Sequence, residues 1–116
     1  MKLTFVYLSP FLADARRLKL VDEDLQELES ALMDQPDAGV TVAGTGGVRK
    51  IRFSPSRWRR GKSGAIRVMY MYFPGAAHVY FFLAFGKNEQ ANITPQQKEL
   101  CRAYAANIKK RLERGA

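Results

Sequence analysis

The sequence predicts an α+β fold in which an antiparallel β-sheet is covered by N-terminal helices and by one C-terminal helix. Three observations support this prediction. Apolar residues recur with helical spacing near both ends of the chain, short apolar segments in the middle are separated by glycine-rich or proline-rich turns, and 47% of the 116 residues are hydrophobic, enough for one core. We therefore expect residues 1–116 to form a single domain.

A strand and two helices are expected in the N-terminal third. Residues 3–8 alternate loosely in polarity, which favours a strand, and Pro10 suits the first turn of a short helix that runs to Arg17. A second helix should begin near Asp22, where successive acidic residues face the positive end of the helix dipole, and should end at residues 35–39. Its apolar face consists of Val21, Leu25, Leu28 and Leu32.

The remaining elements are strands and one helix. Strands are expected over residues 40–43, 48–53, 65–73 and 78–85. The last two are apolar on both faces, so they should form a hairpin in the covered centre of the sheet. The C-terminal helix should begin at Thr94, because this residue is followed by a proline at the first helical position and by Gln97, which can complete a capping box.

The positive charge of the chain is concentrated in its middle. Between Ala38 and Asn88 there are nine lysines and arginines and no aspartate or glutamate, whereas the remainder of the chain sums to −1 and the whole chain to +8. A segment of one sign indicates a surface that binds a polyanion, most simply the phosphates of nucleic acid. An anionic membrane surface, an acidic protein partner and a solvated basic loop are the alternatives.

The sequence also argues against several kinds of site and location. The single cysteine, Cys101, cannot form an internal disulfide and favours a reducing compartment such as the cytoplasm. A Pro-Gly turn interrupts the apolar residues 68–85, so we expect no membrane-spanning helix. His, Cys, Asp and Glu show no metal-ligand spacing, and the single histidine, His78, lies in an apolar strand, so we expect no metal and no other cofactor.

Cations on the predicted strands are the first candidates for a functional site. Lys50 and Arg52 share one strand face, about 7 Å apart, a spacing that can straddle a phosphodiester. Arg67 interrupts an otherwise apolar central strand, where a charge is costly unless it is paired, for example with Glu99, or opens onto a site that binds an anion. Lys87 follows the last strand, where functional side chains are frequent.

The loop at residues 54–64 supplies further candidates. Trp58 can stack on a base, or it can anchor the loop to the core. The cations around it, which can clamp phosphates, are Arg57, Arg59, Arg60 and Lys62.

These residues permit RNA cleavage without metal or histidine. The ribose 2′-hydroxyl can attack its own phosphate while fixed cations stabilise the anionic transition state. A base is also needed, and Lys50 is the best candidate, because its neighbours Arg49 and Arg52 disfavour its charged form.

Three segments resemble motifs of HigB-like toxins in the RelE/ParE superfamily of type II toxin–antitoxin systems. They are Gly-Thr-Gly-Gly-Val-Arg-Lys-Ile-Arg at residues 44–52, the Gly-Lys-Ser-Gly and Arg-Val-Met-Tyr segments within residues 61–70, and Phe-Gly-Lys-Asn-Glu at residues 85–89. The resemblance implies a RelE-like (microbial ribonuclease-like) fold and an endoribonuclease that cuts mRNA in the ribosomal A site. It implies catalytic cations at Lys50, Arg52, Arg67 and Lys87, and a basic RNA-binding surround that includes Arg49, Arg60 and Lys62.

The resemblance also implies partners. The chain should bind a cognate antitoxin, often a helix-turn-helix protein, and should reach operator DNA only as part of that complex. One departure concerns Phe85, where many relatives carry tyrosine; phenylalanine can still stack on a base, but proton donation would need another group, such as Tyr70, Tyr72 or Tyr80. A ParE-like gyrase inhibitor, a non-catalytic nucleic-acid-binding module and an inactive toxin are the rival interpretations.

Overall fold

A computed structural model describes residues 2–58 and 64–115 of the chain. The strands are β1 (Thr4–Tyr7), β2 (Val40–Thr41), β3 (Arg49–Phe53), β4 (Ile66–Phe73) and β5 (His78–Gly86), and the helices are α1 (Ser9–Arg17), α2 (Asp22–Asp34) and α3 (Pro95–Glu113). These bounds confirm the α+β prediction, and Thr94 and Gln97 form the expected capping box of α3. A 3-10 turn, Ser56–Trp58, follows β3.

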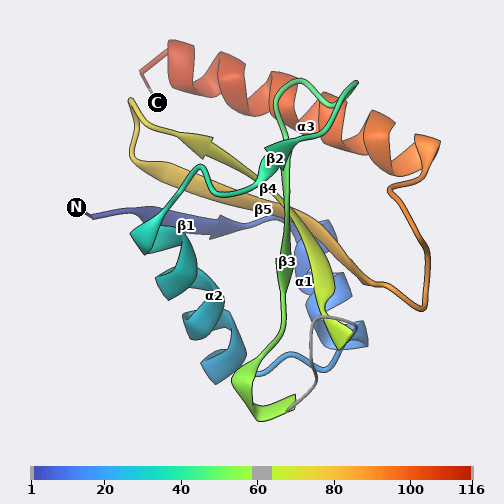
Figure 1. Cartoon of the computed structure of the whole chain (residues 1–116). Helices are drawn as coiled ribbons and strands as arrows, with labels where there is room; N and C mark the ends of the chain where they lie inside the picture. The colour runs from blue at the N-terminus through green and yellow to red at the C-terminus, as the bar shows by residue number, and fades with distance from the viewer. Residues whose placement is uncertain (1, 59–63, 116) are drawn as a thin grey trace.

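The sheet has the strand order β1-β5-β4-β3-β2 (Figure 1). Strands β2 to β5 pair antiparallel as expected, but β1 runs parallel to β5, so the sheet is mixed and the prediction of a wholly antiparallel sheet is wrong for this strand. The reason is topological. Helices α1 and α2 carry the chain from one edge strand to the other, and the meander that follows returns β5 beside β1 in the same direction.

Two hydrophobic layers cover the sheet, one on each face (Figure 1). On one face, Phe11 of α1 and Leu28 of α2 pack against Val68 and Phe81. On the other, Cys101 and Ile108 of α3 pack against β4 and β5. The central strands β4 and β5 are therefore buried from both sides, as their apolar sequences predict.

A β-bulge in β5 changes which residues face α3. Met69 pairs with Leu83, but the next residue of β4, Tyr70, pairs with Phe81, so Phe82 is the additional residue. Phe82 and Leu83 both pack on the α3 side, and the alternation continues from there to Phe85. The bulge therefore places Phe85 on the same face as its register partner Arg67.

The α1–α2 layer gives a direct test of core packing. Leu28 is fully buried, whereas Leu12 on the neighbouring helix is 39% exposed. We expect Leu28→Ala to lower the free energy of unfolding by about 2–5 kcal/mol, because it removes apolar contacts and leaves a cavity, and Leu12→Ala to lower it by less than about 1 kcal/mol. Urea denaturation measures both values, and equal losses would contradict this packing.

Candidate functional site

A groove of about 550 Å³ opens on the α3 side of the sheet, beyond the part that the helix covers. Its cations are Lys50, Arg52 and Arg67. Its other lining residues are Ala38 and Val40 near β2, Ile51 of β3, and Ala91 and Asn92 from the loop before α3. Three of the four predicted catalytic cations are thus brought together, on adjacent strands.

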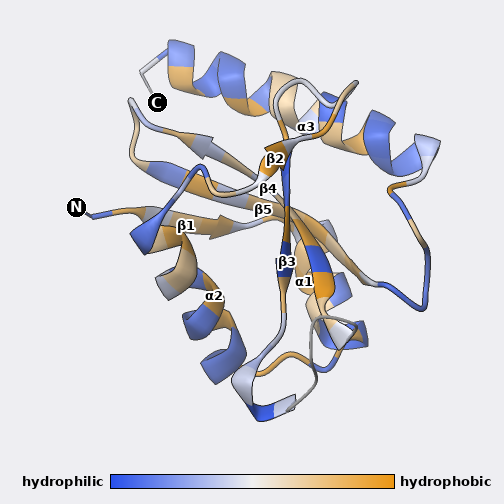
Figure 2. Ribbon diagram, viewed as in Figure 1, coloured by the Kyte–Doolittle hydropathy of each residue, from blue (hydrophilic) through white to orange (hydrophobic). Residues whose placement is uncertain are grey.

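Strand register explains why these cations meet. Arg52 and Arg67 are direct cross-strand partners, and Lys50 lies two residues from Arg52 on the same face of β3. Figure 2 shows β3 as mainly hydrophilic (blue), whereas the central strand β5 is mainly hydrophobic (orange). Like charges on directly opposed residues destabilise a sheet, so this arrangement favours an anion that lies between them.

Arg67 is held in place without a carboxylate. Its Nη1 donates to the carbonyl oxygen of Ala65 over 3.0 Å, and within the described residues no groove cation forms an ion pair. Glu99, the distant acid considered as its partner, pairs instead with Arg102 at 2.8 Å. The positive charge of the groove is therefore available to a ligand.

Arg49 lies outside the groove, although it adjoins Lys50 in sequence. Successive residues of a strand point to opposite faces, and Arg49 Nη1 donates to the carbonyl oxygens of Asp37 (3.2 Å) and Gly39 (2.6 Å). Its contacts hold the segment before β2 against the sheet. The cations beside Lys50 in the groove are Arg52 and Arg67, not Arg49.

Arg57 forms an ion pair with a buried carboxylate. Its guanidinium forms a forked ion pair with Asp24, with Nε–Oδ1 2.9 Å and Nη2–Oδ2 2.7 Å, and also donates to the carbonyl oxygen of Lys19. These bonds hold the pKa of Asp24 below its ordinary value, against the opposing effect of burial. The contacts assign Arg57 to anchoring the loop, a role that the local sequence, which contains no acid, did not reveal.

The rest of the predicted RNA-binding loop divides into two parts. Trp58 is half-buried and packs against the α1–α2 core, which matches the anchoring alternative. Arg59, Arg60 and Lys62 lie outside the described residues.

Lys87 lines a different hollow from the other predicted catalytic cations. This hollow, of about 410 Å³, is lined by Leu18, Trp58, Gly64, Ala65, Ile66, Gly86, Lys87 and Asn88. It lies at the same end of the sheet as the groove but opens on the other face, because Leu18, Trp58 and Ile66 pack in the α1–α2 layer whereas Arg67 points to the α3 side. The structure therefore places Lys87 at the same end of the sheet as the groove cations, but not in the groove.

Two aromatic predictions need correction. Phe85 is 1% exposed and packs in the α3 core cluster, so it offers no ring face for stacking on a base in this conformation. Tyr70, a candidate proton donor, is fully buried; its hydroxyl donates to the carbonyl oxygen of Pro36 and accepts from Gly39 N–H, and burial raises its pKa. Tyr72 and Tyr80 also pack against the core clusters.

The other reactive side chains serve the structure. Cys101 is buried beneath α3, and burial raises the pKa of its thiol to about 11. His78 lies beside the β4–β5 turn, where its Nδ1 contacts the carbonyl oxygen of Ala76. Among the described residues, no three His, Cys, Asp or Glu side chains are grouped in a way that suits a metal ion.

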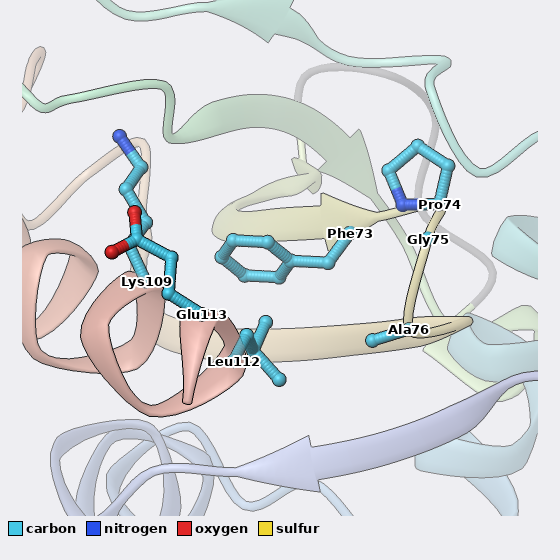
Figure 3. Close-up of a pocket in the computed structure, with 7 residues that line it drawn as sticks. All are labelled: Phe73, Pro74, Gly75, Ala76, Lys109, Leu112 and Glu113. Carbon is cyan, nitrogen blue, oxygen red and sulfur yellow. The ribbon is translucent and has the colours of Figure 1, made fainter. Parts of the chain in front are cut away.

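A mainly apolar hollow of about 400 Å³ lies at the other end of β4, between the β4–β5 turn and the last turns of α3 (Figure 3). Phe73 and Leu112 form much of its surface, with Lys109 and Glu113 on the helical side. Lys109 Nζ donates to the carbonyl oxygen of Gly46 over 2.6 Å. Lys109 is the one cation among its described lining residues, and Phe73 lies about 20 Å along β4 from Arg67. This hollow is therefore separate from the cationic groove.

Comparison with known proteins identifies the family. A family model described as the RelE toxin of the RelE/RelB toxin–antitoxin system matches residues 8–115. The chain belongs to the RelE toxin family. The toxin also resembles the solved structure of a double arginine-to-alanine mutant of the E. coli toxin RelE in the free state, with a TM-score of 0.51 and 16% sequence identity over 78% of this chain and 88% of that chain. At this identity the likeness supports the fold.

Family membership confirms the predicted superfamily and makes the chain a toxin of a toxin–antitoxin system, which implies an antitoxin partner. Within the described residues, no helix has the length and apolar character needed to span a membrane. The groove rim at Ala91 and Asn92 was missed in the sequence analysis, since neither residue carries a charge or a motif.

The Asp24–Arg57 pair predicts a specific pH dependence. A carboxylate with a lowered pKa in the folded state stabilises the fold above its unfolded pKa of about 4, and this contribution is lost as the pH falls further. We expect Asp24→Asn to lower the free energy of unfolding at pH 7 and to flatten its fall between about pH 4 and pH 2. Denaturation across this range tests it, with Asp34→Asn, an exposed carboxylate of the same helix, as the control. Parallel pH profiles for wild type and Asp24→Asn would contradict the assignment.

Proposed function

We propose that the toxin is a ribosome-dependent endoribonuclease that cuts mRNA and thereby inhibits translation. The observation that carries this proposal is the groove in which Lys50, Arg52 and Arg67 converge without a carboxylate partner among the described residues. Three fixed cations suit a phosphodiester whose negative charge increases in the transition state. Membership in the RelE toxin family supports the same reaction class.

The proposed reaction uses the RNA as its own nucleophile. The 2′-hydroxyl oxygen forms a bond to the adjacent phosphorus, the bond from phosphorus to the 5′-oxygen breaks, and the products are a 2′,3′-cyclic phosphate and a 5′-hydroxyl end. Arg52 and Arg67 stabilise the non-bridging oxygens, because guanidinium groups remain charged and bind phosphate oxygens in pairs. Lys50 accepts the 2′-hydroxyl proton, since a lysine amine can serve as a general base and a guanidinium does not. The 5′-oxygen takes up a proton from solvent.

The composition of the groove supports ribosome dependence. Its described rim consists of the small or uncharged residues Ala38, Val40, Ala91 and Asn92, and the nearby ring of Phe85 is buried. The groove therefore supplies charge to the phosphate but few groups that orient the bases. In-line attack needs an oriented strand, and a decoding ribosome holds mRNA in a defined conformation, which can supply this part of the rate enhancement.

The motifs at residues 44–52 and 85–89 support a finer assignment to the HigB-like branch. On this basis we propose a helix-turn-helix antitoxin as the partner, operator DNA as a contact of the complex only, and the cytoplasm as the place of action. Lys87 then holds a phosphate that flanks the one that is cleaved, where the RNA strand passes the end of the sheet that Lys87 shares with the groove.

Mapping RNA ends after induction tests the function. When the toxin is expressed without its antitoxin, we expect new 5′ ends inside translated codons, because cleavage needs mRNA on the ribosome. Blocking translation should remove these ends. Growth arrest with intact mRNA and altered DNA supercoiling would favour a gyrase inhibitor, and unaffected growth would favour a binding module or an inactive toxin.

Groove substitutions test the site itself. We expect Arg67→Ala and Lys50→Ala each to lower the rate of cleavage by about 100-fold or more, because each removes a charge that acts in the transition state. Melting temperatures should stay close to that of wild type, since these charges have no carboxylate partner in the part of the chain that the structure describes. Lys110→Ala, an exposed cation of α3, is the control and should cleave normally. Near-wild-type cleavage by both groove variants, once shown to be folded, would overturn the assignment.

A further inference from the structure

Helix α1 completes the edge of β5 where strand β1 has ended. The last register pair between β1 and β5 is Tyr7–Phe81, yet β5 continues to Gly86. Beyond that pair, Asp14 Oδ2 accepts the N–H of Ala84 at 2.9 Å, and Arg17 Nη2 donates to the carbonyl oxygen of Ala84 at 3.1 Å. Two side chains of α1 thus satisfy the backbone groups that a neighbouring strand would otherwise pair.

The same arginine reaches the turn that carries Lys87. Arg17 Nε lies 2.6 Å from Glu89 Oε2, and its Nη2 lies 3.1 Å from Oε1. Glu89 Oε1 in turn accepts the N–H of Gly86 at 2.7 Å, and Glu89 N–H donates to the carbonyl oxygen of Gly86 at 3.0 Å. Gly86 and Glu89, which flank Lys87 and Asn88, are therefore tied to each other and to α1.

The turn is also closely packed. A Cβ atom on Gly86 would lie 3.0 Å from Asn88 Oδ1, so the absence of a side chain there lets Asn88 fold over the backbone. Lys87, at the tip of this turn, remains exposed and lines the hollow at the same end of the sheet as the groove.

Folding stability does not account for the ion pair between Arg17 and Glu89. The side chains of Arg17 and Glu89 are 45% and 33% exposed, and ion pairs at such exposure contribute little to the free energy of folding. Hydrogen bonds that orient a residue near a ligand matter more for where that residue is held than for folding.

We propose that Arg17 is a positioning residue for Lys87. Together with Asp14 and Glu89 it fixes the turn after β5, so that the Lys87 ammonium meets the phosphate next to the scissile one. This role rests on the proposed ribonuclease function, and it concerns binding of the RNA strand rather than the chemical step.

A double-mutant cycle tests the proposal through KM and kcat for cleavage of mRNA on programmed ribosomes. We expect Lys87→Ala and Arg17→Ala each to raise KM by about tenfold with kcat within about twofold, because a contact that is equal in the ground state and the transition state affects only KM. The double variant should also raise KM about tenfold, and not about 100-fold, because Arg17 acts through Lys87.

Arg102→Ala is the matched control. Like Arg17, Arg102 forms an ion pair with an acid three residues earlier, Glu99, and donates to a backbone carbonyl oxygen, that of Gly44. Its side chain is 53% exposed. It is remote from Lys87 in the sequence and touches a different turn. We expect its KM and kcat to match those of wild type.

Other outcomes separate the two proposals. Additive effects of Arg17→Ala and Lys87→Ala, an unchanged KM in Arg17→Ala, or an equal change in Arg102→Ala would overturn the positioning role while leaving the ribonuclease function intact. A wild-type chain that cuts no mRNA on ribosomes would overturn both. Should Arg17→Ala fail to fold, Glu89→Gln takes its place in the cycle, since it removes the charge that Arg17 binds but keeps an oxygen for the N–H of Gly86.

Discussion

The pairing of β4 with β5 is the constraint on which the rest of the structure depends. Both strands are almost wholly apolar, so both of their faces need a covering layer, and helices α1 and α2 on one side and α3 on the other supply it. Helix α3 covers only part of its face. Arg67 lies on β4 just beyond the part of the sheet that α3 covers. Its charged side chain therefore lines a groove, and it is not buried without a partner in the core.

Charge is divided between the two faces of this sheet. Helix α2 carries six carboxylates and no cation, and it lies in the layer opposite the groove. Two of the predicted RNA-binding arginines turn out to hold loops: Arg49 binds backbone carbonyls before β2, and Arg57 binds the buried carboxylate of Asp24. Within the described residues, the groove cations differ from these two in having no protein acceptor beyond the Ala65 carbonyl bonded to Arg67. The bonding partner, rather than the residue type, thus separates the structural cations from the candidate site cations here.

The arginine at position 17 shows how a helix can take over part of the work of a strand. Strand β1 is short and parallel to β5, and it leaves β5 without a strand on that side beyond Phe81. Asp14 and Arg17 occupy this edge, and through Glu89 they connect α1 to the turn with Lys87. The same contacts protect an open strand edge and, in the proposed role, orient a cation at the end of the sheet where the groove lies.

Most elements of the fold were predictable from local patterns. Helical spacing identified α2, the capping box at Thr94 identified the start of α3, and the continuous apolar runs of β4 and β5 placed them in the centre of the sheet. Alternation along β3 correctly grouped Lys50 with Arg52, and the break in polarity at Arg67 identified a third groove residue. The parallel pairing of β1 was not predictable in this way, because it depends on where the helices carry the chain.

By itself, then, the sequence determined the elements of this protein, the family they resemble and the face of β3 that carries charge, since each of these follows from residues that are neighbours in the chain or repeat with a fixed period. The tertiary structure alone decided which cations share a site. Strand register brings Arg52 and Arg67 together, and Lys87 lines a separate hollow. The bulge at Phe82 places Phe85 on the face that α3 covers, where it is buried. Contacts between residues far apart in the chain depend on register and packing, and no local pattern encodes either.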